Sequence, residues 1–131
     1  MKVLFCRSFT PGSILIRLLT FSRWSHCALV REDGMAIEAT WPKVRRVPAD
    51  IIIAGHSAHE YGEIRAKDGA WEFAESQVGK PYDLSGLWNF LASRDWTTDD
   101  KWFCSELVAY ATGGWRSAGR ITPEMLYEAS A

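Results

Sequence analysis

The feature that most constrains the fold is a pair of apolar runs separated by a short acidic turn. Residues 24–30 and 35–40 carry mostly apolar side chains, and Glu32-Asp33-Gly34 lies between them. A three-residue loop with Gly in the left-handed position is typical of a β-hairpin. A two-residue Asp-Gly turn would instead place apolar side chains opposite polar ones. The pattern therefore predicts a hairpin in which Ala28 faces Glu38.

This register decides which side chains share a face. Residues 27, 29, 35 and 37 form an apolar face, while His26 and Glu38 become diagonal neighbours on the other face. A carboxylate bound to one ring nitrogen fixes the tautomer of a histidine and leaves the other nitrogen free to take a proton. A histidine in a half-buried strand is more often structural than catalytic. Glu38 beside it strengthens the interpretation of His26 as a base.

The remaining pattern predicts one domain over residues 1–131, because no repeat, low-complexity tract or charge run interrupts it. We expect an α+β fold with a small antiparallel sheet packed against helices. The expected elements are a strand at 2–6, a helix from Ile14, one or two strands within 44–53, a polar loop at 55–60, a strand at 61–66, a helix capped by Asp68 and ending at Gly79, a helix capped by Asp83, a helix from Cys104 to Gly113, and a helix after Thr122.

Composition narrows the classes of function. Fifteen basic and sixteen acidic residues give a net charge of −1, so no strong field attracts nucleic acid, and we expect no nucleic-acid partner. The apolar run Ile14–Ile16 is cut by Arg17, which predicts neither an export signal nor stable membrane insertion. Three cysteines, Cys6, Cys27 and Cys104, are an odd number with no close pair, which suggests a reducing compartment. We expect a cytoplasmic or phage-encoded protein.

Cys104 begins a predicted helix, where free backbone N–H groups and the helix dipole stabilise a thiolate. A cysteine at this position is suited to act as a nucleophile. The alternative is that Cys104 is the first apolar residue of a stripe that faces the core and continues through Leu107, Val108 and Ala111. Position alone does not separate these two interpretations.

The combination of Cys104 with other motifs of the chain favours the interpretation of Cys104 as a nucleophile. The chain contains Trp24–Val30 followed by Ile37–Ala39, then Gly79–Asp83, and finally Trp102–Val108 around the cysteine. This set resembles the circularly permuted branch of the NlpC-type papain-like cysteine hydrolases, the YiiX-like and lecithin:retinol acyltransferase-like branch. In that branch the histidine hairpin precedes the cysteine helix, as it does here. The resemblance runs from about Phe9 to Ala111, most of the chain.

The resemblance implies a role for several residues. Cys104 matches the nucleophile at a helix N-terminus, His26 matches the base, and Glu38 matches the third, orienting position. Cys27 departs from the pattern, because a Gly or aliphatic residue is commoner after the histidine. Four further residues are candidates for binding substrate: Tyr82 and Asp83, which match the family's Tyr-Asp pair, and Ser25 and Ser105, which adjoin the histidine and the cysteine.

The implied activity is cleavage of an amide bond, in a peptidoglycan-type or other small peptide, through an acyl-enzyme at Cys104. Acyl transfer or hydrolysis of a lipid ester or thioester uses the same chemistry and stays open. So does a non-catalytic module of a phage particle or secretion system. We expect no cofactor, and neither the His56 and His59 pair nor the Arg45 and Arg46 pair suggests a second site, since a metal needs more ligands than two histidines.

Overall fold

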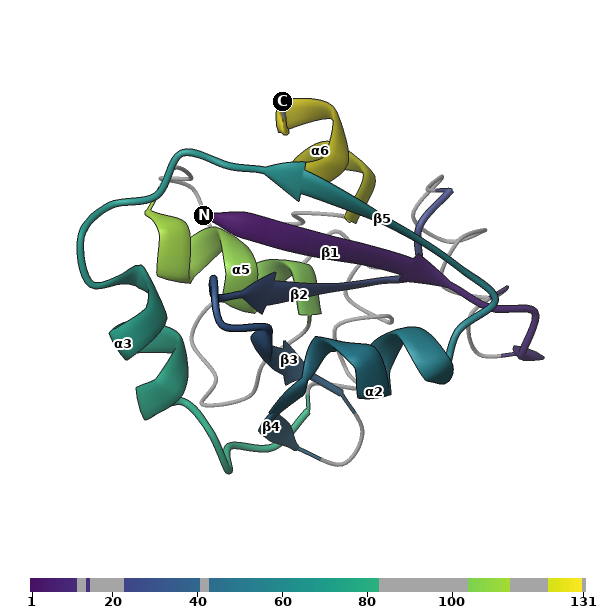
Figure 1. The fold of residues 1–131 in the computed structure, drawn as a ribbon, viewed down its shortest axis with the longest axis horizontal. Coiled ribbons are helices and arrows are strands. Elements are labelled where there is room, and N and C mark those ends of the chain that lie inside the picture. Colours follow the sequence, from purple (N-terminus) through teal and green to yellow (C-terminus); the bar gives the residue numbers. More distant parts are fainter. Residues whose placement is uncertain (12–13, 15–22, 41–42, 83–103, 114–122, 131) are drawn as a thin grey trace, which may run out of the picture.

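An antiparallel sheet with the strand order β4-β3-β2-β1-β5 forms the centre of the fold (Figure 1). The computed structural model describes residues 1–11, 14, 23–40, 43–82, 104–113 and 123–130. The strands are β1 (Lys2–Arg7), β2 (His26–Val30), β3 (Met35–Ala39), β4 (Val44–Pro48) and β5 (Ala58–Glu63); the helices of the described part are α2 (Ala49–Ala54), α3 (Ala70–Ser76), α5 (Cys104–Thr112) and α6 (Pro123–Ala129). The architecture is the α+β class that the sequence predicts.

The hairpin of β2 and β3 has the predicted register. Leu29 pairs with Ile37, as a three-residue loop requires. Inside the loop, Gly34 has a φ of 88°, a conformation that a side chain disfavours. The carboxylate of Asp33 accepts a hydrogen bond from the backbone N–H of Met35 at 3.1 Å, which closes the turn. The turn chemistry thus fixes which residues of both strands share a face.

Buried side chains form one cluster on each face of the sheet. Alternate residues of the central strands, such as Phe5 and Leu29, join α3, α5 and α6 in the larger cluster. The intervening residues, such as Cys6 and Ala28, join α2 in the smaller one. Figure 1 shows α2 and α5 on opposite sides of the sheet. Residues at the end of the sheet, between these two faces, can therefore contact side chains from both faces.

The segment after β4 differs from the prediction. Residues 44–48 form one strand, within the one or two expected over 44–53, and Ala49–Ala54 is the helix α2 rather than a second strand. Pro48 has no N–H for a sheet ladder and stands at the N-cap of α2. Ile52 is 1 % exposed and packs in the α2-side cluster. Burial of this one isoleucine against the sheet thus outweighs the β propensity of three consecutive isoleucines.

Two boundaries also differ. The predicted polar loop at 55–60 ends early, because β5 starts at Ala58 rather than Tyr61 and pairs along the whole of β1. The N-cap of α3 is Gly69, with no side-chain cap bond, so the expected capping by Asp68 is wrong. The helix α5 (Cys104–Thr112) is followed by Gly113 with a φ of 75°, where the helix was predicted to end, and the residues just before Cys104 lie outside the described residues. The helices expected at 14–19 and after Asp83 lie outside the described residues.

Candidate active site

The candidate nucleophile Cys104 is the first described residue of α5. This helix packs over β2 and β3, and the Cys104 side chain belongs to the cluster on the α5 side of the sheet. It is 1 % exposed. Its sulfur lies 4.0 Å from the carbonyl oxygen of Ser25, the residue that precedes β2. Packing of α5 on the sheet thus holds the thiol at the point where β2 begins.

The candidate base His26 is the first residue of β2. It shares the face of Ala28, so it approaches the start of the strand from the side opposite to Cys104. Its Nε2 lies 2.6 Å from Oε1 of Glu38 on β3, and Glu38 is 2 % exposed. The structure therefore brings His26 and Glu38 together as the hairpin register predicts. With Nε2 occupied by the carboxylate, Nδ1 is the ring nitrogen left for the thiol.

A second cation holds the other oxygen of the same carboxylate. Arg45 on β4 is the cross-strand partner of Glu38, and its Nε donates to Glu38 Oε2 at 2.7 Å. The side chain of Arg45 is 46 % exposed, so it covers the carboxylate from the solvent side. Both oxygens of Glu38 thus have a fixed partner. Arg45 was not expected at this site, because the sequence suggested only a local pair with Arg46. The signal that could have identified it was the opposite charge of Glu38 and Arg45 on adjacent strands.

The pKa values of the thiol and the imidazole shift toward an ion pair. Burial alone would raise the pKa of Cys104, but hydrogen bonds from the side chains of Cys27 and His26, with the positive charge of His26, hold it well below its usual range. Burial alone would lower the pKa of His26, but hydrogen bonds to Cys104 and Glu38, with their negative charges, raise it to about 10. Both shifts favour the state in which the Cys104 sulfur is a thiolate and the His26 ring an imidazolium.

The neighbouring acidic groups shift in ways that support this state. Burial would raise the pKa of Glu38, but the hydrogen bonds and charges of His26 and Arg45 hold it below its usual value. Burial raises the pKa of Cys6 to about 12, helped by the charges of Glu38 and Cys104. Burial likewise raises the pKa of Cys27 well above its usual value, helped by its hydrogen bond to Cys104. Of these three buried thiols, Cys104 is the one whose pKa is lowered, while those of Cys6 and Cys27 are raised.

The residues expected to bind substrate lie in different places. The backbone N–H and the hydroxyl of Ser25 both donate to the carbonyl of Cys6, at 3.1 and 3.4 Å, so this side chain belongs to the sheet edge. Ser105 is fully buried in α5. Tyr82 is partly buried against the α5-side cluster. Asp83 lies outside the described residues.

The two histidines considered for a metal site are separated by the fold. The ring of His56 stacks on that of His26, with the centroids 5.6 Å apart and the planes at 1°. His59 is exposed on β5 and meets the ring of Tyr61 edge-on. Sequence reasoning missed the place of His56, because the signal is a contact between distant segments. Among the described residues, no group of three or more His, Cys, Asp or Glu is placed to hold a metal ion.

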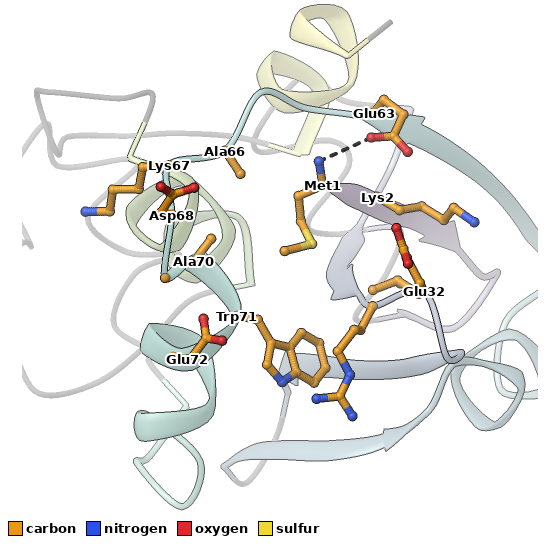
Figure 2. A pocket seen from close by; sticks show the side chains of 13 residues that line it. Met1, Lys2, Glu32, Glu63, Ala66, Lys67, Asp68, Ala70, Trp71 and Glu72 are labelled. Carbon is orange, nitrogen blue, oxygen red and sulfur yellow. Dashed lines mark hydrogen bonds and ion pairs between the residues drawn. The ribbon is translucent and has the colours of Figure 1, made fainter.

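A cavity of about 500 Å³ lies elsewhere in the molecule (Figure 2). Its lining includes Val30, the last residue of β2, together with Trp71 and charged side chains of both signs such as Lys2 and Glu63. His26 stands at the other end of the same strand. The cavity is therefore separate from the candidate active site.

Comparison with known proteins finds matches among solved structures. No protein-family model and no curated protein sequence matches this chain. The crystal structure of the metalloprotein yiiX from Escherichia coli O157:H7, of the family DUF1105, is similar with a TM-score of 0.65 and 25 % identity. The similarity covers 88 % of this chain but 66 % of that chain. The described residues contain no helix long and apolar enough to cross a membrane.

Proposed function

We propose that this chain is a thiol hydrolase that cleaves an amide bond through an acyl-enzyme at Cys104. The observation that carries the proposal is the set of contacts from Arg45 through Glu38 and His26 to Cys104, together with the opposite pKa shifts of the last two. A lowered thiol pKa beside a raised imidazole pKa is typical of cysteine nucleophiles with a histidine base. The similarity to yiiX is consistent with a fold of the YiiX-like kind, and the permuted NlpC-type assignment belongs to the same proposal.

In the first half of the reaction, the Cys104 thiolate attacks the carbonyl carbon of the substrate and forms a carbon–sulfur bond. Backbone N–H groups at the start of α5 stabilise the oxyanion. The tetrahedral intermediate collapses as the imidazolium of His26 gives its proton to the leaving amine. The carbon–nitrogen bond breaks, and an acyl-enzyme with a neutral His26 remains.

In the second half, neutral His26 takes a proton from water, and the hydroxide attacks the thioester carbon. The carbon–sulfur bond breaks and releases the carboxylic acid, while Cys104 returns to the thiolate and His26 keeps the proton. Glu38 holds His26 by Nε2 through both halves, so the ring presents the same nitrogen to the sulfur and to the water. Small peptides and other amides are the proposed substrates.

Acyl transfer, or hydrolysis of a lipid ester or thioester, is an alternative on the same residues, because the same acyl-enzyme can be formed and resolved. The similar protein yiiX is described as a metalloprotein. The described part of this chain offers no cluster of ligands that fits a metal ion, and we therefore assign no step to one.

A substrate screen tests the proposal. Wild type and Cys104→Ala are compared on peptide amides, acyl esters and acyl thioesters under reducing conditions, with Cys6→Ala as a matched control for a buried thiol that does not hydrogen-bond Cys104. We expect amide turnover that Cys104→Ala abolishes and Cys6→Ala retains. Turnover of esters or thioesters alone would establish the alternative. No turnover in any class across the neutral pH range would contradict the proposal and favour a binding module.

A further inference from the structure

The contact of His56 with the candidate base is not used by the proposed reaction. His56 follows the C-terminus of α2 and is tied to its last turn twice. Its backbone N–H donates to the carbonyl of Ile53 at 3.1 Å, and its Nδ1 lies 2.7 Å from the carbonyl oxygen of Ile52. Because a carbonyl can only accept, Nδ1 carries a proton. The plane of the His56 ring is therefore set by α2.

α2 is itself fixed to the sheet. Ile52, the residue whose carbonyl holds the His56 ring, is 1 % exposed and packs with Ala28 and Ala36 in the α2-side cluster. Ala28 lies two residues along β2 from His26, on the same face. His26 is part of β2, and His56 is attached to the sheet through α2. The planes of the two rings are at 1° to each other.

His26 needs such a support. The charged and titratable groups around it are Glu38 from β3, Arg45 behind that carboxylate, Cys104 from α5 and Cys6 from β1. The bond from Nε2 to Glu38 fixes one atom of the ring, but a single hydrogen bond does not fix a plane. A flat group parallel to the ring restricts rotation about the Cβ–Cγ bond and so keeps Nδ1 directed at the sulfur.

We propose that His56 is a positioning residue for His26: its ring is the wall that holds the His26 imidazole in the plane where Glu38 and Cys104 are both in reach. This inference rests on the proposed function. His56 acts through the flat shape of its ring and through the attachment of that ring to α2. A flat apolar ring at position 56 should therefore replace it largely, whereas a small side chain should not.

The test compares His56→Ala and His56→Phe, with His59→Ala as a matched control on the exposed strand β5. The readout is the rate at which iodoacetamide labels Cys104 as a function of pH, followed by peptide mass spectrometry. We expect His56→Ala to raise the pH of half-maximal labelling by about one unit, so labelling slows about tenfold at a pH about one unit below the wild-type midpoint. His56→Phe should recover most of that rate, and His59→Ala should match wild type.

Two results would overturn the inference. One is a folded His56→Ala protein whose labelling profile matches wild type. The other is a His56→Phe protein as slow as His56→Ala, or, if the alanine variant does not fold, a His56→Phe protein about tenfold slower than wild type at a pH about one unit below the wild-type midpoint. Labelling requires no substrate turnover, so failure of the hydrolase proposal leaves this test intact. If amides are cleaved, the kcat of His56→Ala should fall while its KM stays unchanged.

Discussion

At the scale of single residues, Glu38 connects the whole candidate site. Its two oxygens bind His26 and Arg45, and almost none of its surface reaches solvent. The sequence predicted the contact with His26, because the turn at Gly34 sets the hairpin register. It did not predict Arg45 or His56, because these contacts depend on where β4 and α2 lie against the hairpin. No local pattern encodes that arrangement.

Arg45→Ala tests the role of the second cation. Removal of the guanidinium leaves Glu38 Oε2 without its partner, and water can replace it only in part, so we expect a loss of about 1–2 kcal/mol in the free energy of unfolding. Arg46→Ala is the matched control, since Arg46 is equally exposed and pairs with Glu75 at the surface. Urea unfolding of both variants measures the difference. Equal losses would mean that Arg45 is an ordinary surface charge.

At the scale of elements, local turn chemistry was predictable and packing across the sheet was not. The β2–β3 hairpin and the end of α5 before Gly113 follow from patterns within about ten residues. The helix α2 formed where strand propensity pointed to a strand, because Ile52 packs with Ala28 and Ala36 in the cluster on the α2 side of the sheet. Strand β5 likewise begins three residues early because β1 offers a partner along its full length.

A close approach between elements gives a prediction for β5. A Cβ at Gly62 would lie 2.5 Å from Oγ of Ser130 and 3.1 Å from a ring carbon of Phe5. We therefore expect Gly62→Ala to displace the end of α6 and to cost about 1–3 kcal/mol of stability. Gly55→Ala is the control, because its Cβ would meet only backbone oxygens at 3.6 Å or more. Thermal unfolding that ranks the two variants in the opposite order would contradict this packing.

At the scale of the whole molecule, stability should depend on pH through the buried groups. The pKa of His26 is raised from about 6.5 to about 10, so its contribution is complete below pH 6.5 and is lost as pH rises through 10. The pKa of Cys104 is lowered, so its contribution is lost as pH falls and is complete above about pH 8.5. The two changes oppose each other between about pH 6.5 and 8.5.

Above that pH range, the remaining changes in protonation all lower the free energy of unfolding. The raised pKa of Cys6, about 12, means that its contribution also falls once the unfolded thiol ionises near pH 8.5. We expect the urea midpoint to stay nearly level from pH 6.5 to 8.5 and to drop by pH 10. In Cys6→Ala the drop should be smaller. A midpoint that is unchanged at pH 10 in wild type would show that these groups are not buried as described.

The most direct test of the central claim is an ultraviolet titration of thiolate absorbance in the folded protein. Subtraction of the Cys104→Ala titration from that of wild type isolates one thiol among three. The paired thiolate and imidazolium predict a Cys104 midpoint well below the ordinary value of about 8.5. In His26→Ala that midpoint should rise toward the ordinary value. A wild-type midpoint at or above about 8.5 would contradict the account, because Cys104 would then be a buried thiol like Cys6 and Cys27.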